Sequence, residues 1–340
     1  MSDPASAISN KIANETAGYR RRYEEADEGV KRAAAELLRG AIDLHLHCDP
    51  SPQRREMDAF AAAEQASAAG MRAIVLKDHI TGMEDAAWLA RDHADITPPF
   101  EVFGSTWLNN QTAGWNVFAV DKAIIFGARL IGAPTLAAFG EFERAAASGQ
   151  HAAGLMVKGP APRPPEVIYT LDEDGAVRPE VLECIDRVVE ADNVMLGTGH
   201  LSRQEVWAFV HAAHARGAER ICITHALMTA DAPADEYRAL CAQTGALMEF
   251  VAFQILRAGP DAADLVRSVG TENVTISTDA GLAGSASGVD TYTWILTELL
   301  RGGITEEEVL TMAHRNPARL LALDPATTPT AAAPLSGSAD

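Results

Sequence analysis

The sequence predicts an α/β fold, a (β/α)8 barrel of the TIM type, and two observations favour it. Eight short apolar runs are typical of buried strands, and stretches rich in Ala, Leu and Glu separate them. Most neighbouring strand ends lie about 25–30 residues apart, which is the length of one strand, one helix and two loops. The strands are predicted to end near His47, His79, Trp107, Pro134, His200, His225, Phe250 and Asp279. Because helices alternate with strands, the sheet should be parallel with right-handed crossovers.

A helical lead-in should precede the barrel, and a flexible tail should follow it. Residues 1–40 form an N-terminal helical extension, whose polar, helix-prone part at 8–39 is expected to cover the barrel bottom or to serve as an oligomer contact. The barrel itself should span residues 41–323. Residues 324–340 are rich in Pro, Thr, Ala and Ser and too poor in large apolar groups to fold, which predicts a frayed end.

Four stretches between the strands have apolar residues three to four positions apart, as amphipathic helices do. These stretches are Met57–Ala69, Glu84–Ala94, Arg203–Arg216 and Ala234–Thr244. The long interval after the fourth strand contains an insertion at residues 140–180. Within it, Glu166–Leu171 and Ala176–Arg178 flank a turn at Asp172–Gly175, which predicts a hairpin. The insertion would form a lid or substrate wall, or else a surface excursion.

Composition and charge narrow the function classes. The chain has 340 residues, 47% of them hydrophobic, so it can bury a large core in one domain. A net charge of −19 repels polyanions, and we expect no nucleic acid partner. No apolar stretch reaches the ~18 residues of a membrane span, and no secretory leader is recognisable, so a cytoplasmic protein without a membrane partner is predicted. The four cysteines form no Cys-x-x-Cys pair, which argues against disulfides and a cysteine zinc site.

Metal-ligand residues recur at the ends of the predicted strands. His45 and His47 end one apolar run two residues apart, so both imidazoles leave the same face of a strand. Three further apolar strands end in His200, His225 and Asp279. All strand carboxyl ends open on one face of such a barrel, so the five side chains should converge. Imidazoles with a carboxylate suit one or two divalent ions, zinc first, with manganese, iron or cobalt as alternatives.

A metal held in this way predicts hydrolytic chemistry. The ion would lower the pKa of a bound water toward ~7 and polarise a carbonyl or phosphoryl group. Asp279 could take a proton from that water and pass it to the leaving group, with His225 beside it as a second catalytic candidate. Arg54 and Arg55 follow the histidine pair and offer a local anion site for substrate, even in an acidic chain. His79, at the end of strand two, is a further substrate-binding candidate.

The order of the ligands, His-x-His, His, His and Asp on strands one, five, six and eight, resembles the amidohydrolase superfamily. The terminal segment Asn316–Leu321 is similar to the helix that commonly follows the last strand in its members. The resemblance covers about residues 41–323. It implies a metal-dependent hydrolase with the ligands at the mouth of the barrel.

The resemblance also implies a division of the ligands. His45 and His47 would bind the more buried metal together with Asp279. His200 and His225 would bind a second metal or, as in mononuclear members, one of them would orient the water.

The chain departs from the binuclear pattern at strand four. Many binuclear members carry a carbamylated lysine there, whereas this strand ends in Gly132–Thr135. Strand two instead presents Lys77 and His79 on one face. Lys77 has three open roles: a carbamate that bridges two metals, a cation that binds substrate, or a partner in a structural ion pair. With Arg54 or Arg55 in the first loop, this context resembles an uncharacterised amidohydrolase-related group.

The leading function is therefore a metal-dependent hydrolase acting on an amide, cyclic amide, lactone or ester of a small molecule. Non-oxidative decarboxylation and phosphoester hydrolysis are alternatives within enzymes. A small-molecule binder on a decayed barrel is the non-enzyme alternative, against which the presence of all five ligands argues. Two bound ions would favour hydrolysis, and one ion is compatible with either hydrolysis or decarboxylation.

Overall fold

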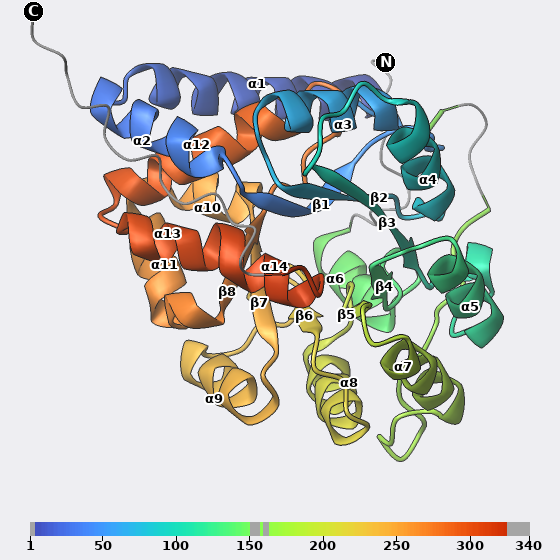
Figure 1. Cartoon of the computed structure of the whole chain (residues 1–340). Helices are drawn as coiled ribbons and strands as arrows, with labels where there is room; N and C mark the ends of the chain where they lie inside the picture. Colours follow the sequence, from blue (N-terminus) through green and yellow to red (C-terminus); the bar gives the residue numbers. More distant parts are fainter. Residues whose placement is uncertain (1–3, 150–156, 159–162, 325–340) are drawn as a thin grey trace, which may run out of the picture.

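A computed structural model describes residues 4–149, 157–158 and 163–324, and it confirms the predicted barrel. Eight parallel strands pair in chain order (Figure 1). They are β1 (Ile42–His47), β2 (Ala73–Lys77), β3 (Glu101–Trp107), β4 (Leu130–Gly132), β5 (Met195–Gly197), β6 (Ile221–Ile223), β7 (Leu247–Val251) and β8 (Val274–Ser277). The chain beyond β8 closes the ring on β1: Asp279 N donates to His45 O at 2.8 Å, and His47 N donates to Ala280 O at 2.9 Å.

Helices surround the ring of strands, as Figure 1 shows. They are α3 (Ala59–Ala68), α4 (Glu84–His93), α5 (Val117–Ile125), α6 (Phe139–Ser148), α7 (Pro179–Ala191), α8 (Arg203–Ala215), α9 (Ala234–Thr244), α10 (Ala252–Ala258), α11 (Ala262–Ser268) and α12 (Gly288–Arg301). Short 3-10 turns are η1 (Asn110–Thr112), η3 (Gly259–Asp261) and η4 (Thr271–Asn273). The four helices predicted from periodicity are confirmed, with ends within two residues. Ser202 and Glu205 form a capping box that starts α8.

The alternation of side chains along the first strand is interrupted inside the barrel. Its pairing with β2 shifts register between Asp43 and Leu46, as at a β-bulge. Leu44 packs in the apolar layer at the start of the strands, while the next residue, His45, reaches the polar cluster at their ends. Consecutive side chains of β1 thus both lie inside the barrel.

The amino ends of the strands are closed by the C-terminal part of the chain. Helix α13 (Glu306–Leu310), the π-helical segment η5 (Thr311–Arg315) and α14 (Asn316–Leu320) follow α12. From α14 and the residue after it, Ala318, Leu320 and Leu321 pack against the apolar layer that includes Ile42 and Leu247.

The N-terminal extension lies elsewhere than expected. It forms α1 (Pro4–Glu24) and α2 (Glu28–Leu38), which pack beside α12 (Figure 1). For α1 the expectation that the extension covers the barrel bottom is wrong, because Ile12 and Tyr19 line the same cavity as His47 and Asp279, at the carboxyl ends of the strands. Within the described residues, no helix combines the length and apolar character needed to cross a bilayer.

The insertion after β4 contains helix α6 and the expected turn. Asp172–Gly175 reverses the chain, and one antiparallel bridge joins Leu171 to Val177, so the hairpin is confined to a single bridge. Residues 150–156 and 159–162 of the insertion lie outside the described residues. The same holds for the predicted tail beyond Asp324.

Candidate metal centre and active site

Three histidines meet the carboxylate of Asp279 at the mouth of the barrel. Asp279 Oδ1 lies 3.0 Å from His45 Nε2 and 3.1 Å from His47 Nε2. Its other oxygen, Oδ2, lies 3.3 Å from His225 Nε2. His45, His47 and Asp279 each place one ligand atom within 4.8 Å of the other two. The structure therefore brings these four predicted residues together from β1 and from the loops after β6 and β8.

The other predicted histidines complete an arc of rings. The His200 ring centroid lies 5.3 Å from that of His225 and 5.7 Å from that of His79. The His79 ring in turn lies 4.9 Å from the His47 ring. His47, His79, His200 and His225 all line one cavity with a volume of about 400 Å³.

Several ring nitrogens of this arc are buried without a hydrogen-bond partner among the described residues. They are His47 Nδ1, His200 Nε2 and both nitrogens of His225. Buried polar atoms normally find partners, since an unmet one costs free energy. A divalent cation accepts lone pairs from imidazole and carboxylate, so the unpartnered Nε2 of His200 and the donor set around Asp279 both fit a metal.

Two carboxylates behind the rings orient them. Glu249 of β7 accepts from His45 Nδ1 at 3.1 Å, and Glu141 of α6 accepts from His200 Nδ1 at 3.1 Å. Each contact favours a proton on Nδ1 and turns Nε2 toward the cluster as the atom that would coordinate a metal, as carboxylate–histidine pairs do in metal sites. The sequence-based prediction missed both residues. For Glu249 a signal existed, because a lone acidic residue in the buried apolar run Leu247–Val251 needs a partner.

The electrostatics of the cluster favour a cation at its centre. Burial lowers the pKa of His45, but Asp279 and Glu249 outweigh burial and raise it to about 9. Burial raises the pKa of Glu249, but His45, His225 and Lys77 outweigh it and bring the value to about 2. The carboxylates that stabilise a proton on His45 would equally stabilise a bound metal ion. His200 differs, because its burial lowers its pKa to about 3, and a neutral imidazole is the form that binds a metal.

The backbone at two of the site residues is strained. His225 and Asp279 have φ values of 47° and 49°, in the left-handed region that side chains other than glycine seldom adopt. Beside Asp279, Thr278 donates from its backbone N (3.0 Å) and its Oγ1 (2.5 Å) to the buried Asp43 carboxylate of β1. Strain of this kind is typical of functional positions, where surrounding contacts hold it in place.

Lys77 lies beneath the cluster rather than in the cavity. Its side chain is buried; Nζ lies 2.6 Å from His45 Nε2 and 4.1 Å from the centre of the Trp107 ring. Burial lowers its pKa to about 8. Because Lys77 is not among the residues that line the cavity, its position gives no support to a direct contact with substrate.

Strand β4 has no room for a side chain at its end. A Cβ on Gly132 would lie 2.1 Å from the Trp107 ring, so the indole covers this position. The same ring carries the Lys77 amine on its face. The lysine thus approaches the histidines from β2 at a place where β4 cannot offer one.

The two predicted substrate arginines have different positions. Arg55 is buried and lines the same cavity as His79: Nη2 donates to Asp78 Oδ2 at 2.6 Å and to Gln53 Oε1 at 2.9 Å, while Nη1 has no hydrogen-bond partner among the described residues. Arg54 is exposed, and the structure does not bring it into the cavity. His79 does line the cavity and pairs through Nδ1 with Thr135 Oγ1 at 3.0 Å.

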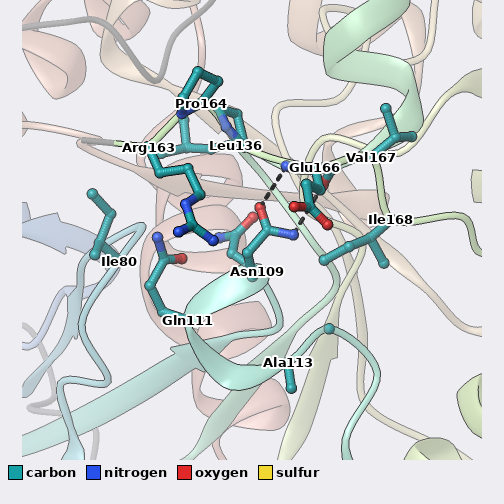
Figure 2. A pocket seen from close by; sticks show the side chains of 13 residues that line it. Ile80, Asn109, Gln111, Ala113, Leu136, Arg163, Pro164, Glu166, Val167 and Ile168 are labelled. Carbon is teal, nitrogen blue, oxygen red and sulfur yellow. Dashed lines mark hydrogen bonds between the residues drawn. The ribbon is translucent and has the colours of Figure 1, made fainter. Parts of the chain in front are cut away.

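A second hollow of about 540 Å³ lies beside the arc of histidine rings. Figure 2 shows Ile80, Asn109, Arg163 and Glu166 around it. Asn109 donates to His79 O at 2.7 Å and to Thr135 Oγ1 at 2.9 Å. The described end of the insertion therefore borders this second hollow, next to the residues that hold His79.

One protein-family model matches more than half of the chain. The model of DUF6282, a family of unknown function, matches residues 40–249. The chain belongs to this family. The DUF6282 match begins just before β1 and ends inside β7, so it includes the four histidines predicted as metal ligands and Glu249, whereas Asp279 lies beyond it. A search of curated proteins gives no match.

Solved structures share the fold of this DUF6282 chain. An amidohydrolase from Pseudomonas aeruginosa is 13% identical with a TM-score of 0.55, covering 84% of this chain and 97% of its own. A promiscuous lactonase template engineered for organophosphate hydrolysis is 15% identical with a TM-score of 0.50, covering 85% and 97%. The inactive dihydroorotase-like domain of the Chaetomium thermophilum CAD-like multifunctional protein is 11% identical with a TM-score of 0.50, covering 84% and 80%. At these identities the likeness shows the fold alone.

Proposed function

We propose that the chain is a metal-dependent hydrolase of the amidohydrolase superfamily that acts on an amide, cyclic amide, lactone or ester of a small molecule. The observation that carries this proposal is the Asp279 carboxylate, which lies within 3.0–3.3 Å of Nε2 of three histidines at the wall of a cavity. A divalent metal bound there would lower the pKa of a water molecule toward ~7 and polarise the substrate carbonyl.

The ligands are proposed as two groups. His45, His47 and Asp279 would hold one ion, since their ligand atoms already lie within 4.8 Å of one another. His200, whose Nε2 is buried without a hydrogen-bond partner, and His225, whose Nε2 faces Asp279 Oδ2 at 3.3 Å, would hold a second ion or orient the water. Zinc suits this imidazole and carboxylate set best, and manganese, iron and cobalt have the same preference for it.

Asp279 is the proposed proton carrier. One oxygen, Oδ1, faces His45 and His47, while Oδ2 faces His225. The carboxylate accepts a proton from the attacking water and returns it to the leaving group. His225 supports this step by keeping Oδ2 aimed at the cavity, and the fixed rings of His45 and His200 keep the reacting groups in place.

Lys77 is proposed to take part in metal binding as a carbamate. Its neutral amine would attack carbon dioxide, forming an N–C bond and releasing one proton, and the resulting carbamate oxygens would face the metal ligands. The contact of Nζ with His45 Nε2 at 2.6 Å supports a position of the amine beside a proposed metal ligand. Substrate contacts are proposed instead for His79 and Arg55, which both line the cavity.

Metal content and hydrolysis together test the proposal. Protein purified without chelators should contain at least one transition metal per chain by elemental analysis and should hydrolyse members of a set of lactones, esters and amides. The double variant His45→Ala, His47→Ala should lose both the metal and the activity. The matched control removes two exposed imidazoles of α8, His211→Ala with His214→Ala, and should keep both.

Equal metal content in the two double variants would contradict the site. If the native protein holds one metal and releases carbon dioxide from carboxylic acids without hydrolysing any of the set, the reaction is decarboxylation instead.

A further inference from the structure

Helix α1 forms the outer wall of the cavity that contains the metal-ligand arc. Ile12, Glu15, Thr16 and Tyr19 line the same cavity, of about 400 Å³, as His47 and Asp279 do. Positions separated by three, four and seven residues lie on one face of a helix, so α1 presents a continuous face to the site. The N-terminal extension is thus part of the site.

Ion pairs hold α1 against the barrel and neutralise the charges of this wall. Arg257 of α10 donates to Glu15 at 2.9 Å, and its guanidinium lies 5.4 Å from the Phe253 ring centre. Arg22 of α1 donates to Glu298 of α12 at 3.2 Å. Deeper in the cavity, Nη2 of Arg55 pairs with Asp78, while Nη1 of Arg55 has no hydrogen-bond partner among the described residues.

The rest of the cavity wall carries many apolar side chains, one of which, Phe253, lies beside the His225 ring at 6.1 Å between ring centroids. It is built from α1, α10, α12 and the loops after β6 and β8. Its apolar side chains are Ile12, Met228, Phe253, Leu256, Leu282 and Trp294. A molecule with its reacting carbonyl at Asp279 would therefore place the rest of its body against hydrocarbon, where burying each methylene is favourable.

We propose that the substrate is a small, uncharged ester, lactone or amide with a hydrocarbon or aromatic body, and that α1 selects it. The inference rests on the proposed function and deepens it. Ile12 on α1 and Phe253 on α10 are the specificity-determining residues, because they line the apolar wall from two different helices. A cavity of this volume is within the range that encloses most of a small ligand.

Alkyl hydroxamates provide a probe that does not depend on turnover. The metal-replete protein is titrated calorimetrically with acetohydroxamate, butyrohydroxamate, hexanohydroxamate and octanohydroxamate. The Kd should fall about three- to fourfold per added methylene until the cavity is filled. Adipic acid monohydroxamate, which places a carboxylate where hexanohydroxamate has its end methyl group, should bind at least tenfold more weakly than hexanohydroxamate.

Variants of α1 test whether this helix causes the increase in hydroxamate affinity with chain length. Ile12→Asn should flatten the dependence on chain length while the Kd of acetohydroxamate changes less than twofold. The matched control, Ala13→Asn, introduces asparagine at an exposed position of α1 and should leave the Kd values of the four hydroxamates unchanged. Phe253→Ser tests the part of the same wall that α10 contributes; because Phe253 lies beside the His225 ring, its metal content is measured as well. Circular dichroism shows that each variant folds.

The outcomes separate the two proposals. If acetohydroxamate binds but longer chains or the charged analogue bind equally well or better in native protein, the apolar substrate class is overturned and the proposed function stands. If the Ile12→Asn series matches the native series, α1 is not the selecting wall. If the purified protein holds no metal and binds no hydroxamate, the proposed function fails and this inference fails with it.

Discussion

The two ends of the barrel are built from the same strands and have opposite chemistry. At the amino end, Ile42 of β1 and Leu247 of β7 pack with Leu320 of α14 in a dry apolar layer. At the carboxyl end, the strands and the loops after them bring together buried imidazoles, carboxylates and one amine, several without a hydrogen-bond partner. Burial of apolar groups stabilises the first end, whereas burial of polar groups costs free energy at the second.

This difference teaches where stability and chemistry reside. Apolar burial at the closed amino end can offset the free-energy cost of the buried histidines at the other end. The amino end can pack fully because it needs no opening for substrate. Changes at the carboxyl end should therefore alter metal binding and turnover, and changes at the amino end should alter the free energy of unfolding. Four predictions test this division, in order of their expected effect on turnover.

The largest effect on turnover is expected from Asp279→Asn. The amide keeps the shape of the side chain but cannot accept the proton of the water, so kcat should fall about 10²- to 10⁴-fold. Asparagine also tolerates the left-handed backbone, so the fold should persist by circular dichroism. Asp192→Asn is the matched control, since Asp192 is exposed and has a similar φ of 56°. Near-native kcat in the metal-loaded Asp279→Asn protein would refute the proton-carrier role.

The next effect concerns the amine beneath the histidines. Lys77→Met keeps the chain length and removes the nitrogen, so the protein should lose about one metal per chain and most of its activity. Millimolar formate or acetate should restore part of the activity by occupying the vacated place. Lys122→Met is the control, because Lys122 also lies over an aromatic ring, with Nζ 4.8 Å from the Phe126 centroid, but on the surface.

Unchanged metal content and unchanged kinetics in the Lys77→Met protein would leave only the structural role of Lys77. Unchanged metal content with a raised KM would instead indicate that Lys77 binds substrate, although Lys77 is not among the residues that line the cavity.

A smaller effect is expected from Glu249→Gln. The amide fills the same space but orients His45 less strongly, so metal affinity should fall about 10- to 100-fold, measured by competition with a chromogenic chelator. Excess metal should restore most of the turnover, which distinguishes this positioning role from that of Asp279. Glu205→Gln is the control, since it changes a buried carboxylate that accepts from the backbone N of Ser202 and Thr170 rather than from a histidine ring. Equal metal affinity in both variants would remove Glu249 from the site.

No effect on turnover is expected at the closed end. Leu320→Ala leaves a cavity in the apolar layer and should lower the free energy of unfolding by about 2–5 kcal/mol, measured by urea denaturation. The kcat per folded molecule and the metal content should stay native. Arg319→Ala, on the exposed side of α14, should change stability by less than about 1 kcal/mol. A loss of metal in the Leu320→Ala protein would show that the two ends are coupled.

Much of the architecture follows from local pattern. The barrel, four of its helices and the convergence of His45, His47, His200, His225 and Asp279 were predictable, because strand and helix periodicities repeat along the chain and parallel strands end on one face. The placement of α1 was not predictable, since a polar amphipathic helix fits either end of the barrel. Its ion pairs with α10 and α12 join positions more than 200 residues away in the chain.

The sequence by itself thus determined the fold and the residue types at the mouth of the barrel. Only the tertiary structure decided which atoms meet. Glu249 reaches His45 across 204 residues, and a register shift in β1 turns both Leu44 and His45 inward, against strict alternation. At Gly132, the Trp107 ring excludes a side chain from β4 and supports the amine of Lys77 from β2. Periodicity specifies which face of an element is buried, whereas packing between distant elements specifies the partner, and that leaves no local trace.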